Sequence, residues 1–288
     1  MIETAPASTT LTRARGAFAE GRLTWSGVGL TIFSILVYLF LYAPIVILVI
    51  FSFTRDEFGV RWTGFTLDWY IRLFNNPRMM GAAWNTLVVA SVSTVASTII
   101  GTLLAMAMER YRFRGRGAME GLIYLPIVVP EIVMAVALLA FSAIAFDLIK
   151  MMTGETLRRN LTTVTIGHIA FSISFVVVVV RTSLKNFDRR LEEAAADLGA
   201  DNWNIFWRIT FPLILPGIVG GALLAFTLSL DDFIISLFLS GPGTSLLPVE
   251  VYNRVRRAVT PEINAISTLM LLLSMVLVAL SQLLQRRR

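Results

Sequence analysis

Long apolar stretches separated by short polar segments make up most of this chain of 288 residues. A helix of about 20 apolar residues crosses the hydrocarbon core of a bilayer, and six stretches reach that length. A five-valine run in the fourth stretch does not indicate a strand, because a single span in lipid satisfies its backbone hydrogen bonds only as a helix. We therefore predict an all-α integral membrane protein with six transmembrane helices. Their predicted positions are residues 29–53, 82–108, 118–146, 164–184, 213–240 and 262–284.

The polar segments divide the rest of the chain into two tails and short loops. Residues 1–28 are predicted to form a cytoplasmic tail, residues 29–284 the transmembrane domain, and residues 285–288 a basic C-terminal tail. The first apolar run is longer than the core of a signal peptide, so we expect it to stay as a span. With 56% hydrophobic and 15% charged residues, the composition excludes a water-soluble globular protein.

Arginines in the short loops predict the orientation of the chain in the membrane. The loop at residues 109–117 holds Arg110, Arg112, Arg114 and Arg116, and such a density of positive charge in a short loop is typical of the cytoplasmic side. Six spans place both termini on one side, so we predict a multi-pass membrane protein with both termini in the cytoplasm. The net charge of +6 is explained by this bias and does not indicate nucleic-acid binding.

The longest polar interruption deep in the chain is residues 186–216, and its pattern predicts two short helices. The first is predicted at residues 190–198, because alanines favour a helix and acidic residues occupy its first turns. Gly199 supplies the left-handed residue that ends a helix, and Asp201 is a candidate N-cap for the second. We expect the aromatic stripe of the second helix to anchor the loop to its own subunit. That stripe is Trp203, Phe206 and Trp207.

Three carboxylates lie within or beside the predicted spans, where an ionised group is costly. Asp231 and Asp232 are neighbours, so on a helix they point about 100° apart and at most one faces a given cavity squarely. Glu131 follows Pro130, which frees a backbone carbonyl nearby. Each is a candidate to line a polar translocation path, or alternatively to cap a helix break or bond a neighbouring helix. His168 is read as an interhelical hydrogen-bond donor rather than a ligand or base.

The residue inventory argues against chemistry performed by this chain itself. It holds no cysteine and one histidine, which disfavours thiolate and histidine-rich metal sites. A phosphate-binding loop needs a Gly-Lys pair, and neither Lys150 nor Lys185 follows a glycine. We predict no catalytic residue, no metal site and no cofactor in this chain. If ATP drives it, another chain binds the nucleotide.

The loop at residues 186–216 resembles the EAA loop of permease subunits in ATP-binding-cassette importers. The matching positions are Glu193, Ala194, Ala195, Gly199, Ile209 and Pro212. The one departure is Phe211, where the pattern has leucine. The resemblance implies the type I importer fold, also called MetI-like, and implies that the loop docks into a groove on a cytoplasmic ATPase.

Further segments resemble permeases of spermidine/putrescine importers. They are NTLVVA (residues 85–90), ERYRFRG (109–115), PEIVMA (130–135), SLDDF (229–233) with the following SGPG, and TPEINA (260–265). This resemblance implies that the chain lies in a bacterial inner membrane and translocates polyamines by alternating access. It also implies an ATPase dimer that binds ATP and Mg²⁺, a second related permease and an extracytoplasmic polyamine-binding protein as partners.

Two other readings of the sequence stay open. The same importer architecture serves iron, sulfate, sugars and other small solutes, and the ligand of the cognate binding protein would separate these. A self-sufficient ion-coupled carrier or membrane enzyme would instead use Glu131, Asp231, Asp232 and His168, and a carrier would work alone in liposomes without ATP. Neighbouring aspartates do not easily converge as those of an intramembrane aspartyl protease must.

Overall fold

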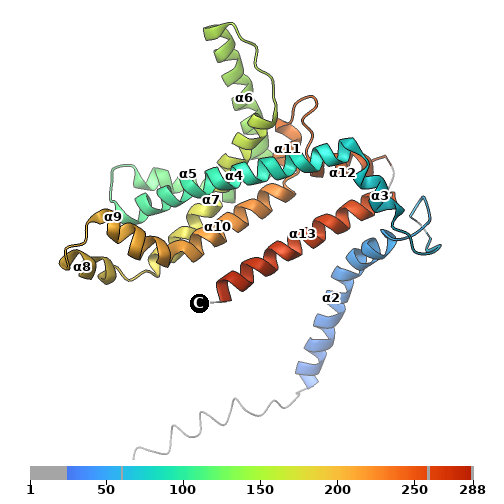
Figure 1. Cartoon of the computed structure of the whole chain (residues 1–288), viewed down its shortest axis with the longest axis horizontal. Coiled ribbons are helices and arrows are strands. Elements are labelled where there is room, and N and C mark those ends of the chain that lie inside the picture. The colour runs from blue at the N-terminus through green and yellow to red at the C-terminus, as the bar shows by residue number, and fades with distance from the viewer. Residues whose placement is uncertain (1–24, 60, 258–259, 287–288) are drawn as a thin grey trace, which may run out of the picture. The chain divides into compact units, whose positions relative to one another are not determined.

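The computed structural model describes residues 25–59, 61–257 and 260–286 and is almost entirely helical (Figure 1). The predicted tail at residues 1–28 lies outside the described residues except for its last four, which already belong to a helix. Of the predicted basic tail, residues 285 and 286 end the last helix and residues 287 and 288 are outside the described part. The helices are α2 (Trp25–Phe51), α3 (Asp68–Phe74), α4 (Pro77–Arg110), α5 (Arg116–Val128), α6 (Glu131–Thr153), α7 (Leu161–Lys185), α8 (Arg190–Asp197), α9 (Asn202–Ile205), the π-helical turn η1 (Phe206–Thr210), α10 (Phe211–Asp231), α11 (Ile234–Leu239), α12 (Leu247–Val255) and α13 (Pro261–Arg286).

The chain divides into two compact units, and the boundary between them along the chain falls between Ile50 and Phe51. The first unit consists of α2, an apolar helix that carries Pro44 in its interior. Its large apolar side chains are exposed along most of its described length, as a helix surrounded by lipid requires. All other described helices belong to the second unit.

The core of the second unit is formed by α4, α7 and α10, which pack against one another (Figure 1). Val176, in the valine run of α7, lies between a glycine of α4 and a glycine of α10. A Cβ atom added to Gly101 would come within 2.8 Å of Val176, and one added to Gly221 would lie 3.4 Å from it. Because neither glycine has a side chain, all three backbones approach closely, which is how helices pack in lipid.

Two predicted spans are each broken into two helices. The span predicted at residues 118–146 is divided between α5 and α6, because Pro130 has no N–H and holds the preceding Val129 extended. The span predicted at residues 213–240 is divided between α10 and α11, because Asp232 adopts an extended conformation and its side chain takes over the capping of α11. Each of these two predicted spans therefore consists of two helices, and each break carries a candidate carboxylate.

Among the described residues, five helices are long and apolar enough to cross a membrane. They are Gly29–Phe51, Pro77–Arg110, Glu131–Thr153, Leu161–Lys185 and Asn202–Asp231. A sixth, shorter apolar stretch is Pro261–Val276 in α13. The predicted fold class, an all-α multi-pass membrane protein, is confirmed.

Candidate functional site

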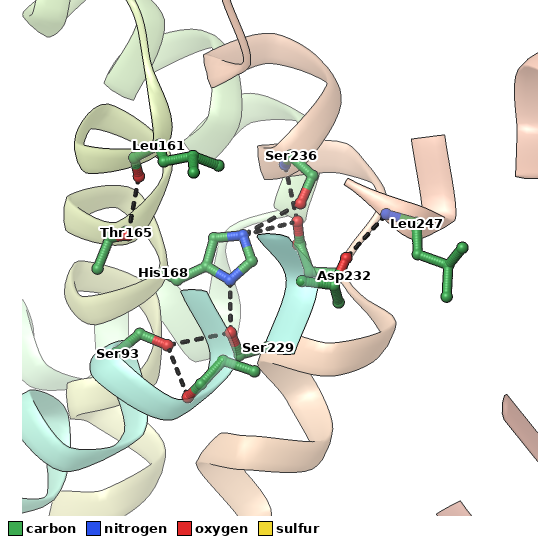
Figure 2. Close-up of polar contacts among 10 residues, drawn as sticks. Ser93, Leu161, Thr165, His168, Ser229, Asp232, Ser236 and Leu247 are labelled. Carbon is green, nitrogen blue, oxygen red and sulfur yellow. Dashed lines mark hydrogen bonds and ion pairs between the residues drawn. The ribbon is translucent and has the colours of Figure 1, made fainter. Parts of the chain in front are cut away.

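A buried polar cluster lies at the break between α10 and α11 (Figure 2). His168 of α7 is 1% exposed and stands at its centre. Its Nδ1 lies 2.6 Å from Ser229 Oγ on α10, and its Nε2 lies 3.2 Å from Ser236 Oγ on α11. Ser229 in turn is 3.0 Å from Ser93 Oγ on α4. The expectation that His168 bonds between helices is confirmed, and the cluster joins four of them.

A glycine beside the histidine allows this convergence. A Cβ atom on Gly167 would fall 2.3 Å from Leu239 Cδ1 and 3.0 Å from Ile235 Cγ2, both on α11. Such contacts are shorter than van der Waals packing tolerates, so a larger residue at position 167 would displace these two side chains of α11. The glycine therefore brings Asp232 and Ser236 within reach of His168.

Asp232 is the acidic member of the cluster, and its two oxygens have different surroundings. Oδ1 accepts a hydrogen bond from the backbone N–H of Ser236 at 2.8 Å and lies 3.3 Å from His168 Nε2. Oδ2 is buried and, within the described part of the chain, receives no N–H or hydroxyl hydrogen. The polar group that does reach this carboxylate is another carboxyl, that of the half-buried Glu131 at the start of α6. Two carboxyl groups thus face each other, an arrangement that either a proton shared between them or a cationic donor stabilises.

The structure separates the three predicted path residues. Glu131 and Asp232 come together at the two helix breaks, whereas Asp231 is exposed and lies outside the cluster. This matches the expectation that neighbouring aspartates on a helix point in different directions. Their roles in transport stay predictions.

Ser229, His168 and Asp232 have the residue types of a hydrolytic triad but not its geometry. In such a triad the acid bonds Nδ1 and the nucleophile bonds Nε2, and here the two are exchanged. Ser229 is also only 2% exposed, in the contact between α4 and α10. The cluster therefore offers a substrate no access to a nucleophile, which disfavours the reading as a membrane enzyme.

The polar loop at residues 186–216 folds as its local sequence predicts. The first helix, α8, ends at Asp197 with Leu198 as its C-cap, and Gly199 has φ +86°, the left-handed conformation. The N–H of Gly199 bonds Ala196 O at 2.9 Å and that of Ala200 bonds Ala195 O at 3.0 Å, which closes the helix end. Asp201 caps the next helix by accepting from Asn204 N at 3.1 Å. Both predicted helix boundaries are confirmed.

The loop is attached to its own subunit by polar contacts, and its aromatic stripe contributes packing at one end only. Glu192 of α8 bonds both Arg110, at the end of α4, and Thr210 in η1. Arg189 donates to the backbone oxygen of Glu109 at 2.9 Å. In the aromatic stripe, Trp203 is 69% and Trp207 45% exposed, while the rings of Phe206 and Trp207 pack on Phe211 at the start of α10.

The residues of the EAA-like pattern fall into two groups by exposure. Glu193, Ala194 and Gly199 are exposed at the loop surface, and Ala195 is half-buried. Ile209 and Pro212 are half-buried in the connection to α10. Leu198, next to Gly199 in the first group, is 89% exposed. The first group is thus placed where a partner could contact it, and the second where it shapes the loop.

Comparison with known proteins identifies the family. Residues 97–288 match the family described as "Binding-protein-dependent transport system inner membrane component". The chain belongs to this family. It is 42% identical to the spermidine/putrescine transport system permease protein PotC of Haemophilus influenzae over 255 residues, which cover 88% of this chain and 95% of that relative. It is 41% identical to the putrescine transport system permease protein PotI of Escherichia coli strain K12 over 234 residues, or 81% of this chain and 82% of the relative.

The permease also resembles solved structures of transporters. A bacterial ABC transporter involved in the import of the acidic polysaccharide alginate superimposes with a TM-score of 0.76 at 20% identity, over 91% of this chain and 96% of that one. At this identity the likeness shows the fold alone, and it confirms the predicted type I importer permease fold. The protein is therefore a multi-pass membrane component of a transport system and not an enzyme.

The sequence did not identify several residues of the buried cluster and of the polar contacts that attach the loop. They are Ser93, Ser229, Ser236, Glu192 and Thr210, together with Arg110 in its role as an ion-pair partner. Small hydroxyl residues are common in membrane helices, and nothing local distinguishes those that meet a histidine. The arginine-rich loop predicts the orientation of the chain, but nothing in it indicates that Arg110 forms an ion pair with Glu192. A polar residue four positions from an intramembrane carboxylate, as Ser236 is from Asp232, is the one signal that the sequence offered.

Proposed function

We propose that this permease translocates polyamines through the membrane as one subunit of an ATP-driven importer. Two relatives that are more than 40% identical over most of the chain carry spermidine or putrescine in their names. The observation that carries the proposal is the pair of carboxyl groups at the helix breaks, Glu131 and Asp232, with an oxygen that lacks a donor. A primary ammonium group supplies three donors and a positive charge, which satisfies both acceptors at once.

The sign of the charge separates polyamines from the other solutes of this architecture. A sulfate permease of Escherichia coli strain K12 is 31% identical over 76% of this chain, and the transporter with the similar fold imports an acidic polysaccharide. The fold therefore does not determine the solute. A sulfate ion approaching Glu131 and Asp232 would meet like charges in a medium of low dielectric constant, where repulsion is strong. The acidic pair favours a cation over an anion.

We further propose that α8 and Gly199 form the contact with a separate ATPase. The described side chains of α8 are exposed or half-buried, and Leu198 presents an apolar side chain to solvent at its end. An exposed apolar residue beside an alanine-rich surface suits a short helix that enters a groove on a partner. Glu192 would carry the motion inward, since it is bonded to the end of α4. This ATPase dimer would bind ATP and Mg²⁺.

The remaining partners follow from the same architecture. We propose a second, related permease subunit and an extracytoplasmic binding protein that delivers the polyamine. A solved structure with a similar fold, at a TM-score of 0.73, holds a periplasmic protein bound to its solute. The arginine-rich segment at residues 109–117 and the EAA-like loop lie at the same end of the core, since Arg110 bonds Glu192. This favours the cytoplasmic side for both and for the two termini.

Reconstitution tests the proposed function. The permease is purified together with its second permease subunit and its ATPase and placed in liposomes. The cognate binding protein and labelled putrescine or spermidine are then added. We expect ATP-dependent uptake that disappears when either the ATPase or the binding protein is left out. A binding protein that retains sulfate or a sugar instead would refute the polyamine assignment, and uptake by the permease alone would refute the importer.

A further inference from the structure

His168, at the centre of the buried cluster, contacts Asp232, which forms the acidic pair with Glu131. His168 Nε2 lies 3.3 Å from Asp232 Oδ1, the oxygen that also accepts the Ser236 backbone N–H. The side chains of both residues are at least 97% buried, at 0% and 3% exposed. A buried hydrogen bond of this kind holds a carboxylate in one orientation, because water is not there to replace the lost partner.

The partners of the ring determine which nitrogen carries a proton. Nε2 faces Asp232 Oδ1, which already accepts a hydrogen from Ser236 and can only accept another. Nε2 must therefore carry hydrogen, and Nδ1 of the neutral ring is then free to accept from the Ser229 hydroxyl at 2.6 Å. Ser93, 3.0 Å from Ser229, can donate to that hydroxyl in turn. The chain of hydroxyls fixes the ring from α4 and α10, while its other edge points at Asp232 (Figure 2).

We propose that His168 is a positioning residue for the acidic pair, a role that rests on the proposed polyamine function. By holding Oδ1, it keeps Oδ2 of Asp232 turned away from the α7 side and available to a cationic group. Without the ring, the carboxylate is restrained through the Ser236 N–H alone and can rotate into the space that the imidazole leaves. Asp232 Oδ2, which lacks a donor, would then form hydrogen bonds with hydroxyl groups of the protein instead of with the substrate.

A pair of substitutions separates positioning from simple filling of space. The amide of glutamine reaches about as far as Nε2 of histidine, whereas the amide of asparagine reaches only as far as Nδ1. His168→Gln therefore keeps a donor for Asp232, and His168→Asn keeps contact with Ser229 alone. Both are polar, buried and smaller than or similar in size to the histidine, so they serve as controls for each other. In the complete reconstituted transporter, we expect uptake by His168→Gln within about 2-fold of the wild type and uptake by His168→Asn reduced about 10-fold, the effect of one charge-assisted hydrogen bond.

A second measurement tests the contact without any substrate. Thermal unfolding of the purified complex is recorded for His168→Asn, for Asp232→Ala and for the double variant. If the histidine holds the carboxylate, the double variant melts higher than the sum of the two single shifts predicts, because the same contact cannot be lost twice. Additive shifts would overturn the proposal, and so would equal uptake by the glutamine and asparagine variants.

The two proposals can fail separately. If the wild-type complex takes up no polyamine but imports the solute that its binding protein retains, the polyamine assignment fails. The glutamine and asparagine variants are then compared with that solute, and the melting shifts apply unchanged. If the wild type takes up polyamine while both variants behave alike, His168 has no positioning role and the proposed function stands.

Discussion

The permease has two polar clusters that use the same kinds of residue in opposite environments. At the break between α10 and α11, the side chains of His168 and Asp232 are 0% and 3% exposed. At the polar loop, those of Arg110 and Glu192 are 31% and 20% exposed. A buried pair has partners that are set by packing and is insensitive to salt, whereas a pair in contact with water can exchange its partner at small cost. The first arrangement suits a site of fixed geometry, and the second suits a joint that changes contacts during a cycle.

The comparison predicts that the largest effects come from the buried cluster. Asp232→Asn keeps the shape and the acceptor for Ser236 but removes the charge, and we expect uptake of polyamine to fall about 30- to 100-fold, as the loss of a charged partner in a buried site implies. Asp231→Asn, at the exposed neighbour, is the matched control and should stay within about 2-fold of the wild type. Uptake is measured in proteoliposomes at equal amounts of assembled complex. Equal losses in the two variants would mean that burial does not distinguish the aspartates.

The ion pair between Arg110 and Glu192 connects α4 to α8, and exchanging its two charges tests whether this connection matters for transport. Arg110→Glu and Glu192→Arg each place like charges together, and we expect each to reduce uptake about 10-fold while ATP hydrolysis continues, since like charges cost about as much as the pair contributes. The double exchange restores the pair and should recover most of the uptake. Arg112→Glu changes the charge of the same segment at an exposed position and is the control. A double variant no better than either single variant would argue against a joint between α4 and α8.

The glycine that ends α8 is expected to have a smaller effect, and the chain contains its own control. Gly199 has φ +86° and Gly154, which ends α6, has φ +77°, and an added Cβ would meet no other atom within 4 Å at either. An alanine in the left-handed conformation costs about 1–2 kcal/mol, so Gly199→Ala and Gly154→Ala should lower thermal stability alike. If the loop couples the ATPase, only Gly199→Ala reduces solute transported per ATP, by a few-fold. A similar loss in both variants would indicate a general effect on stability.

The salt dependence of the two pairs tests the difference between the buried cluster and the loop, and it is the smallest of the expected effects. The coupling between Arg110 and Glu192, measured by a double-mutant cycle in thermal unfolding, should fall to about half between about 0.05 M and 0.5 M salt, because the Debye length shortens around this partly exposed pair. The coupling between His168 and Asp232 should change by less than about a tenth, since ions do not enter the buried cluster. A buried pair as sensitive to salt as the loop pair would contradict the assignment of one rigid and one adaptable cluster.

Prediction from the sequence succeeded for features that depend only on residues close together along the chain. The ends of α8 and the start of α9 follow from Gly199 and Asp201, whose conformations depend on a few neighbouring residues. It left open whether the two broken spans are continuous, because hydropathy measures only whether a segment tolerates lipid and not whether its helix is continuous. Pro130 carried a signal for the first break. The second break at Asp232 depends on a capping bond that the sequence does not distinguish from a helical position.

The amino-acid sequence by itself determined that this chain crosses a membrane several times as helices, that its longest polar interruption folds into two short helices, and that its family is one of transport components. Those properties depend on the transfer of side chains to lipid and on short-range helix signals. Only the tertiary structure decided which aspartate is buried, that Glu131 approaches it, and that His168 holds it from 64 positions away along the chain. Such contacts arise where glycines let helices approach, and the pairing of distant helix faces is a property of the packed molecule rather than of any segment.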